Sequence, residues 1–354
     1  MSRAANAPDP QLAQAVQANC NIADAAHAGD MTLCIYLLQM REFYRWEQDF
    51  ALSATMPRQD VAAWLSAREA MWDGLEDQAF AEIRVDGRVY DPFDRLGINA
   101  ALNGSGLYYG AGYTSPGRAT FFLADLEAVE QRELLPVYRL GREYARSLAS
   151  PPATLSAHGI ELRQESLRRW LWEKYEAWTL RRSPGAFKRA LEHHGFAQQG
   201  EGAVDAMALA QADTLILHEL AEAGVGEQLG AGWKALRSDM RDRRTDLLLR
   251  AARDLFADCQ LVLPRLLQQH SEGALHFWFS NFDGWRRVLF PGLQLAYEDW
   301  SDGKGVDSLE RAVATGAPHW AALCQKVLAA HAQRGIDARD EIRQVLESGV
   351  LSTA

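Results

Sequence analysis

The sequence predicts a mainly helical α+β protein, with a helical-bundle-like core and a small antiparallel β-sheet inserted near residues 82–124. Long stretches combine apolar residues at helical spacing with strong helix formers, and the run at 204–223 contains neither glycine nor proline. By contrast, residues 82–90 alternate around a central Asp-Gly pair, which is the strongest short-range signal for a β-hairpin. The Gly-rich patterns of dinucleotide-binding and P-loop folds are absent.

The first 80 residues are expected to form three helices after a disordered segment. Residues 1–10 form that segment, and Pro10 precedes the first helix. The second helix covers residues 31–50, and its first ten residues are almost wholly apolar, so we expect it to lie at the centre of the protein. Pro57 then interrupts the chain, and the apolar spacing predicts an amphipathic helix over residues 58–80.

The predicted sheet consists of a hairpin and two further strands. Asp86 and Gly87 form the hairpin turn. Strands at 107–113 and 119–124 flank a Pro-Gly pair of the kind found in type II turns. The Gly-rich segment 103–106 lacks the Lys-Ser/Thr of a P-loop and therefore predicts a turn. An alternative is that the tyrosines after this turn cover a ligand: Tyr108, Tyr109 and Tyr113.

Helices are expected again after the sheet. Asp125 is predicted to be the N-cap of a helix over 127–148, kinked at Pro136. Pro151 and Pro152 mark the best candidate for a boundary between subdomains. Further helices are predicted over 161–182, 185–194, 204–223 and 245–269, and two closing helices over 306–348.

These breaks divide the chain into a disordered segment, residues 1–10, and two helical regions. The first region, 11–150, contains the inserted sheet, and the second, 151–354, carries the candidate site. With 354 residues and an apolar fraction of 48%, the chain can form one large domain or two of ordinary size. We expect the two regions to pack together as one globular unit.

Charge and composition argue against several classes of protein. A net charge of −10 argues against a general nucleic-acid binder, which needs a basic surface. Four widely spaced cysteines without a Cys-x-x-Cys pair indicate neither a disulfide framework nor a zinc ribbon. The sequence shows no secretion signal, and no apolar run reaches the roughly 18 residues that would span a bilayer. We therefore expect a soluble cytoplasmic protein that binds neither nucleic acid nor membranes.

The strongest candidate site lies on the helix at 204–223, whose C-terminus is predicted at Gly224 and Gly226. His218 and Glu222 are four residues apart, so they are neighbours on a helix face that is otherwise small or apolar. A buried charge is costly unless it is paired or bound to a metal ion. The zinc-protease pattern His-Glu-x-x-His fails at its fifth position, which is Glu222. The alternative is a core histidine that is hydrogen-bonded to a carboxylate.

Two aspartates on the next helix complete a candidate metal site. Asp254 and Asp258 interrupt the apolar stripe of residues 245–269 at i, i+4 spacing. We predict that they meet His218 and Glu222 across the helix pair and bind a transition metal. Oxygen and imidazole ligands favour iron, manganese or zinc. The alternative is that arginines close by on the same helix satisfy both carboxylates.

Two glutamates of the helix at 31–50 are candidate catalytic carboxylates. Glu47 lies in an aromatic stripe, and Glu42 lies among apolar residues with Arg45 three positions away. The functional hypothesis is that both glutamates contribute carboxylates to a shared site. The alternative is that each glutamate pairs with an arginine.

These residues support two functional hypotheses of different classes. The first is a metal-dependent enzyme, of oxidase or hydrolase type, whose His/carboxylate site between helices takes a small-molecule ligand. A ferritin-like di-iron site would need two Glu-x-x-His patterns, which are absent. The alternative is a non-catalytic helical binding or assembly protein, in which the same residues form a structural polar network. A third hypothesis is a pocket for an apolar or aromatic molecule near residues 276–285. The oligomeric state stays open.

Overall fold

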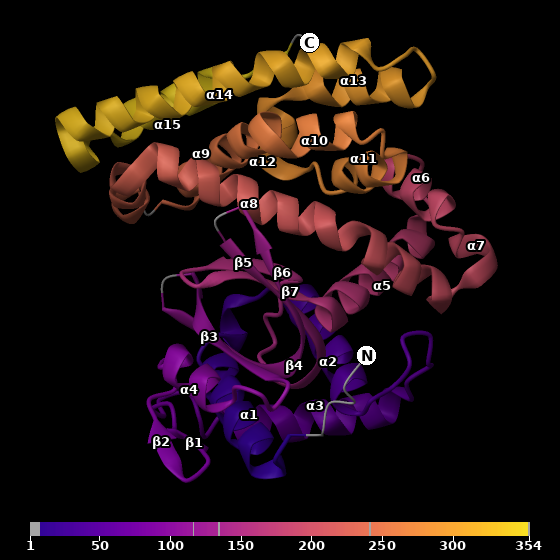
Figure 1. Ribbon diagram of the computed structural model, residues 1–354, viewed down its shortest axis with the longest axis vertical. Coiled ribbons are helices and arrows are strands. Elements are labelled where there is room, and N and C mark those ends of the chain that lie inside the picture. The colour runs from indigo at the N-terminus through magenta and orange to yellow at the C-terminus, as the bar shows by residue number, and fades with distance from the viewer. Residues whose placement is uncertain (1–7, 116, 134, 241, 353–354) are drawn as a thin grey trace. The chain divides into compact units, whose positions relative to one another are not determined.

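The chain folds as two units, the first ending at Ala177 and the second beginning at Trp178 (Figure 1). Helices dominate the chain, and the strands seen in its described part all belong to the first unit. The prediction of a mainly helical α+β protein is therefore confirmed. The predicted single small sheet near residues 82–124 is incomplete, because the strands form a two-stranded antiparallel sheet and a separate five-stranded sheet that extends to Arg163 and contains one parallel pair. The computed structural model describes residues 8–115, 117–133, 135–240 and 242–352.

Three helices open the first unit: α1 (Pro10–Ala25), α2 (Leu33–Glu47) and α3 (Arg58–Trp72). The start of α1 follows the prediction closely, because Pro10 occupies the first turn and the Asp9 side chain accepts a hydrogen bond from the Gln11 amide at 2.9 Å. A short 3₁₀ turn, Ala28–Asp30, precedes α2. Residues 1–7 of the segment predicted to be disordered lie outside the described residues.

The predicted hairpin is confirmed as β1 (Ile83–Val85) and β2 (Arg88–Tyr90), which pair in antiparallel fashion. At its turn, Asp86 and Gly87 have φ values of 48° and 77°. Two positive φ values are what a type I′ turn requires, and glycine adopts them without steric cost. The short helix α4 (Arg95–Ala101) follows the hairpin.

A five-stranded sheet forms the centre of the first unit. Its order is β3-β4-β5-β7-β6, and all neighbouring pairs are antiparallel except the parallel pair β5–β7. The strands predicted at 107–113 and 119–124 are confirmed as β3 and the start of β4, while Pro116 between them lies outside the described residues. The strands are β3 (Leu107–Ser115), β4 (Arg118–Arg132), β5 (Leu135–Arg146), β6 (Ala153–Ser156) and β7 (Gly159–Arg163).

The helix predicted over 127–148 is wrong, because this segment forms the second half of β4 and all of β5. Its Ala, Glu, Leu and Arg residues favour a helix, but strand pairing overrides that preference. The register shifts three times between Leu123 and Ala128, so the buried residues of β4 lose the period of two that identifies a strand. Pro136 pairs with Gln131 close to the end of this hairpin.

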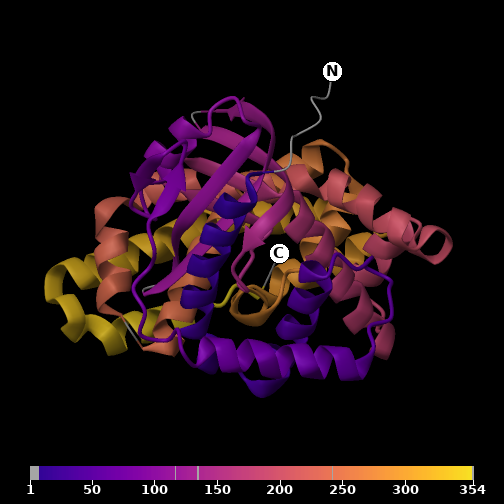
Figure 2. The same cartoon turned by 90° about the horizontal axis from the view of Figure 1, so that it is seen from below.

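Helix α1 packs against one face of the sheet, as Figure 2 shows. Cys20 of α1 is wholly buried there, and its thiol donates a hydrogen bond to the Phe121 carbonyl at 3.2 Å. The opposite face carries Tyr108, Phe122 and Leu140. Tyr108 and Tyr109 therefore lie on opposite faces, because successive side chains of a strand alternate. Pro151 and Pro152 lie between β5 and β6, within the first unit.

Helix α5 (Gln164–Arg181) carries the chain past Ala177. The second unit then continues with α6 (Ala186–His193), α7 (Phe196–Gln199) and the long helix α8 (Glu201–Asp239). The predicted end of this last helix at Gly224 and Gly226 is wrong, because both glycines keep helical backbone angles. The interruption comes at Gly230, whose φ is 66° and ψ −165°.

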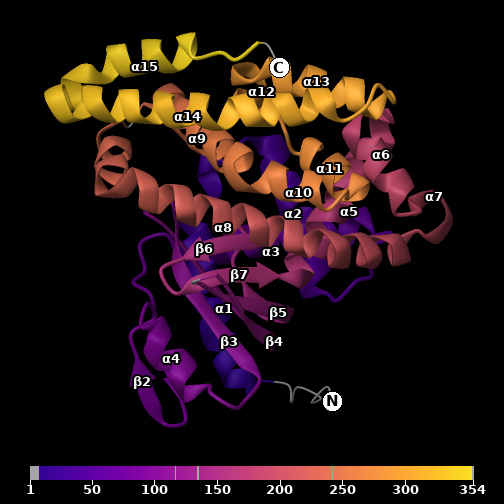
Figure 3. The same ribbon diagram turned by 45° about the horizontal axis from the view of Figure 1, so that its top comes forward.

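The segment predicted to be helical over 245–269 contains α9 (Arg243–Ala257), a π-helical turn (Asp258–Val262) and α10 (Leu263–Gln268). Three helices follow: α11 (Glu272–Phe279), α12 (Gly284–Leu289) and α13 (Pro291–Ser301). The two predicted closing helices are confirmed as α14 (Asp307–Arg334) and α15 (Arg339–Ser348), which lie side by side (Figure 3).

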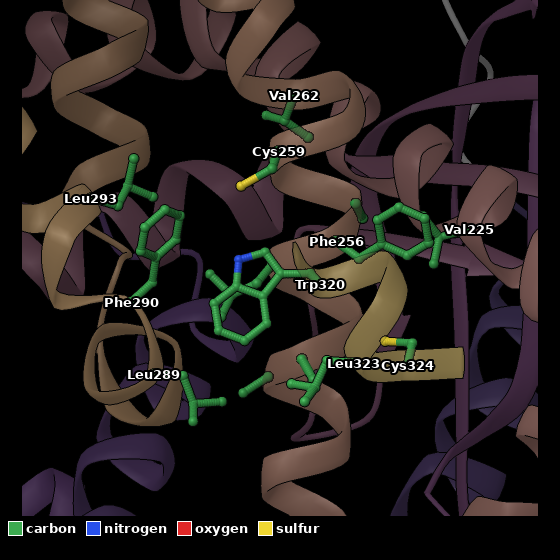
Figure 4. Packing of buried hydrophobic residues seen from close by; sticks show 14 of the residues in the cluster. Val225, Phe256, Cys259, Val262, Leu289, Phe290, Leu293, Trp320, Leu323 and Cys324 are labelled. Carbon is green, nitrogen blue, oxygen red and sulfur yellow. The ribbon is translucent and has the colours of Figure 1, made fainter. Parts of the chain in front are cut away.

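The core of the second unit surrounds Trp320 of α14, which is wholly buried (Figure 4). The ring centroid of Phe290 lies 5.7 Å from that of Trp320, and Cys259 and Leu323 belong to the same cluster. Among the helices in the described part of the chain, none has both the length and the apolar character to cross a membrane.

Candidate functional site

His218 of α8 lies between two carboxylates of the second unit. Its Nε2 atom is 3.3 Å from Oε1 of Glu222, one turn further along the same helix. Its Nδ1 atom is 3.3 Å from Oδ1 of Asp258, the first residue of the π-helical turn. Both ring nitrogens therefore face oxygen atoms, which is the arrangement of a protonated imidazole with two donors.

Asp258 is the most deeply buried member of this group, with a side chain that is 0% exposed. Its Oδ1 atom also accepts a hydrogen bond from Trp278 Nε1 at 3.2 Å, and its Oδ2 atom accepts one from Arg286 Nη1 at 3.1 Å. A buried carboxylate needs such partners, because burial removes the water that would otherwise solvate its charge. Residues from α8, α11 and α12 thus converge on Asp258.

A second arginine forms ion pairs with the other two carboxylates, Glu222 and Asp254. Arg253 of α9 places Nη2 at 2.7 Å from Oε2 of Glu222 and at 2.9 Å from Oδ1 of Asp254. These contacts join three cationic side chains, His218, Arg253 and Arg286, to the carboxylates of Glu222, Asp254 and Asp258, and the charge of Glu219 also acts on Arg253. The positive charges therefore largely balance the negative charges of these carboxylates.

The protonation states follow from these contacts. Burial alone would lower the pKa of His218, but its hydrogen bonds to Asp258 and Glu222 outweigh that effect and raise the pKa well above its usual 6.5. Burial alone would raise the pKa of Glu222, but the hydrogen bond from His218 and the charge of Arg253 lower it to about 2. Burial raises the pKa of Asp254 above its ordinary value, against the opposing charge of Arg253.

This donor set fits a metal ion poorly. A divalent ion bound by Glu222 and Asp258 would lie beside Arg253 and Arg286, which already occupy their oxygen atoms. His218 would also have to give up a proton that two carboxylates hold in place, because a metal ligand must be a neutral imidazole. Across the residues that the structure describes, no three His, Cys, Asp or Glu side chains are arranged to hold a metal ion.

The two candidate catalytic glutamates lie in the first unit, whereas the four candidate metal ligands lie in the second. Glu42 is buried, with Oε2 at 3.0 Å from Arg45 Nε and Oε1 at 2.8 Å from Arg41 Nη2. Glu47 pairs with Arg68 and accepts a hydrogen bond from Trp64. Each glutamate therefore has an arginine partner within its own unit, as the alternative interpretation expects.

Two family models match this chain. The N-terminal domain of a family of unknown function (DUF6866) matches residues 11–163, and the C-terminal domain of the same family matches residues 168–349. The chain belongs to the DUF6866 family. Comparisons with curated proteins and with solved structures found no match. The His218 network lies in the segment matched by the C-terminal DUF6866 domain, and Glu42 and Glu47 lie in the segment matched by the N-terminal domain.

The N-terminal DUF6866 domain also contains a buried ion pair that the sequence did not reveal. The Glu143 carboxylate accepts two hydrogen bonds from Arg163, at 2.9 and 2.8 Å, and both side chains are buried. Burial would raise the pKa of Glu143, but the charges of Arg163 and Arg146 hold it below its usual value. Glu143 was assigned to a helix in the sequence analysis, so its strand neighbour Arg163 could not be anticipated.

A cavity of about 180 Å³ lies in the same domain, between α4, the turn at 103–106 and the strands that follow. Arg95, Tyr108 and His158 line it, and Glu161 contacts the first two of these. The sequence singled out Tyr108 and the Gly-rich turn but gave no signal for Arg95 or Glu161. Glu161 was placed at the start of a helix, whereas it lies in β7.

Proposed function

We propose that this protein is a non-catalytic assembly protein whose copies associate through the exposed apolar part of α2. The observation that carries the proposal is the α2 patch, which consists of Leu33, Cys34, Ile35, Leu37 and Leu38. Under this proposal the network around His218 stabilises the fold and takes no part in a reaction.

The α2 patch is unusual for the surface of a soluble monomer. Its four aliphatic side chains are between 45% and 70% exposed, and they follow one another within a single helix. No charged residue occurs between Met31 and Met40. Contiguous exposed apolar surface of this kind marks interaction sites, whereas single exposed apolar residues carry no such meaning.

Helix α2 exposes these residues because only its second half enters the core. Met40 and Phe43 are buried beside Trp72 of α3, and Tyr36 packs against the same cluster. The aliphatic side chains of the first two turns remain exposed. The one polar anchor described in these turns is the Tyr36 hydroxyl, which donates to Glu69 of α3 at 3.0 Å. The prediction that the apolar start of this helix lies at the centre of the protein is therefore wrong for the single chain. An interface with another chain would explain why these exposed turns are apolar.

A second copy of the same chain is the partner that fits the patch. The chain carries a net charge of −10, so its copies repel one another over most approach directions. The α2 patch is uncharged, and two patches related by a two-fold axis would bring together apolar surface without opposing like charges. Two-fold dimers are also the commonest oligomers, since one patch serves both partners. The patch would form the charge-depleted core of a larger interface.

The His218 network supports the non-catalytic part of the proposal. Each of its three carboxylates contacts at least one cationic side chain, which is the arrangement expected of a structural ion network. Structural ion networks perturb pKa values as active sites do, and the perturbed values of His218 and Glu222 are accounted for by this pairing alone.

The test is the molar mass of the protein in solution, measured by light scattering during size-exclusion chromatography. We expect wild type to be dimeric at micromolar concentrations and Leu38→Glu to be monomeric, because the substitution places a carboxylate in the apolar interface. The matched control is Leu180→Glu, at an α5 residue that is 87% exposed, and this variant should remain dimeric. A monomeric wild type, or a dimeric Leu38→Glu, would contradict the proposal.

Cys34 provides a second, independent test. Of the four cysteines, all within the described residues, Cys34 is exposed and the other three are buried. A short bismaleimide should therefore join two wild-type chains through Cys34 if the α2 patches meet. Cys34→Ser should remove the crosslink without changing the mass in solution. A dimer that never crosslinks would place the interface elsewhere.

A further inference from the structure

We propose that the cavity of the first unit binds a small organic carboxylate, with the anionic group at Arg95 and the apolar part against Tyr108 and Tyr138. The cavity lies between α4, the turn at 103–106 and strands β3 to β5. This site is separate from the α2 patch, and its test does not depend on self-association.

Arg95 is held at the wall of the cavity by two polar contacts. Its Nη1 atom lies 2.6 Å from Oε1 of Glu161, and its Nη2 atom donates to Ser156 Oγ at 3.0 Å. The Tyr108 hydroxyl donates to the same Glu161 oxygen at 2.9 Å. These contacts fix the plane of the guanidinium. Because a guanidinium has five N–H donors, some of them remain for a ligand.

The position of this ion pair points to binding. Arg95 and Glu161 are 7% and 5% exposed, and an ion pair buried this deeply contributes little net stability compared with apolar residues of the same size. Burial raises the pKa of Glu161 above its usual value even beside Arg95 and Tyr108. Glu161 does not line the cavity itself, but it contacts Arg95 and Tyr108, which do. A buried ion pair next to a cavity is typical of functional sites.

The lining favours a negatively charged ligand. Arg95 and His158 are the ionisable side chains among the cavity-lining residues apart from tyrosines, and no carboxylate lines it. The turn at 103–106 contributes backbone at Gly104 and Gly106, which have φ values of 84° and 80°. At both glycines an added Cβ would meet no atom within 4 Å, so the backbone there borders open space. Such positions allow a ligand to approach the main chain closely.

The remaining walls are apolar and aromatic. The rings of Tyr108 and Tyr138 lie with centroids 4.8 Å apart, and Leu126 lies beside them in the lining. Leu96 completes the cavity at its exposed side, where its side chain is 64% accessible. One charged end and one flat apolar side suit a molecule that carries a carboxylate on a ring or a short chain.

The volume limits the size of this ligand. The cavity of about 180 Å³ is smaller than the roughly 300–1,000 Å³ of pockets for drug-sized molecules. It corresponds to about six water molecules at their volume in the liquid. A single-ring or short-chain monocarboxylate is therefore the class we infer, and a nucleotide is too large.

The test uses benzoate as the probe, with its binding followed by calorimetry and by chemical shifts of the protein. We expect saturable binding to wild type and at least tenfold weaker binding of benzyl alcohol, which has the ring without the charge. Leu96→Trp should fill the exposed side of the cavity and lower the affinity for benzoate at least tenfold. Leu180→Trp, a matched substitution at an exposed residue outside the cavity, should leave the affinity unchanged.

A further variant changes the polar lining without replacing either member of the buried ion pair. His158 is exposed, and His158→Gln should weaken benzoate several-fold while the far-ultraviolet circular dichroism stays that of wild type. Inorganic phosphate that binds at the same site more tightly than benzoate would point to a phosphorylated ligand and would overturn the assignment of a carboxylate. No benzoate binding to wild type, equal binding of benzyl alcohol, or undiminished binding to Leu96→Trp would each overturn the proposal.

Discussion

At the scale of single residues, the charge of His218 is set by its two carboxylate neighbours. The i, i+4 spacing correctly places Glu222 next to His218. The spacing of apolar residues on the next predicted helix correctly suggested that Asp258 also contacts His218. The other partners of Asp258 are Trp278 and Arg286, which come from helices further along the chain. Periodicity within one helix cannot predict such partners, so the sequence could not distinguish a metal site from an ion network.

The raised pKa of His218 makes the stability of the protein dependent on pH. Its stabilisation is fully present below the unfolded pKa near 6.5 and is lost as the pH rises through the higher folded pKa. We expect His218→Gln to destabilise the protein more at pH 6 than at pH 9, as measured by urea unfolding at both pH values. When Glu222 is also replaced by Gln, the effect of His218→Gln should differ less between pH 6 and pH 9, because one of the two carboxylates that contact His218 has been removed. A cost that is the same at both pH values would show that His218 is neutral in the folded protein.

The ion network also predicts the metal content. Wild-type protein purified without an affinity tag or chelator should contain well under one equivalent of iron, manganese or zinc by elemental analysis. The metal content of His218→Gln should be no lower than that of wild type. The reason is that Arg253 and Arg286 already occupy the carboxylate oxygens. About one equivalent of metal in wild type that is lost in the variant would restore the hypothesis of a metal-dependent enzyme.

At the scale of elements, the long strands β4 and β5 show where reasoning from sequence fails. Short strands with a clear alternation, such as the hairpin around Gly87, were predicted correctly. Strand β4 runs from Arg118 to Arg132 with irregular register, and its second half has the composition of a helix. Because its partners are set by tertiary pairing, local propensity favoured the wrong element. Glu161 and Glu143 were missed for the same reason, because both lie in strands that were assigned to helices. Arg95 of α4 was missed because its partner, Glu161, comes from a strand far along the chain.

Two glycines of helix α8, Gly226 and Gly230, should respond in opposite ways to substitution by alanine. Gly230 has φ 66° and ψ −165°, a conformation that is essentially restricted to glycine. We expect Gly230→Ala to cost about 1–3 kcal/mol. Gly226 has helical angles and open space around an added Cβ, so Gly226→Ala should stabilise the protein by about 0.5–1 kcal/mol. Chemical denaturation of both variants gives the two values, and equal effects would argue against the kink at Gly230.

At the scale of the whole molecule, the two units correspond closely to the two matched family domains. The domain models separate between residues 163 and 168, where β7 passes into α5, and the units separate after Ala177, near the end of the same helix. The sequence signals at Pro151 and Pro152 fall in a loop of the first unit instead. These two prolines do mark a loop, but they do not reveal that the strands on either side share one sheet.

The second unit has a core of its own, so we expect a fragment that begins at Ser183 to fold independently. Its cluster extends from Ala221 to Leu346 and surrounds Trp320. In this fragment Trp320→Ala should cost about 3–5 kcal/mol, because it leaves a large cavity. Trp320→Phe should cost less than half as much, since the buried Nε1–H of Trp320 has no hydrogen-bond partner to lose. Thermal unfolding followed by circular dichroism provides the comparison, and a fragment without a cooperative transition would contradict this expectation.

The π-helical turn at Asp258–Val262 has a consequence for how substitutions in this region should be designed. A π turn accommodates one residue more than an α-helical turn, so the angular phase of α10 is offset by about 100° from that of α9. A helical wheel drawn continuously from Arg243 to Gln268 will therefore assign the wrong faces after the turn. Deleting one residue within the turn would restore the ordinary phase, rotating Asp258 and α10 relative to each other and forcing one of them to give up its packing.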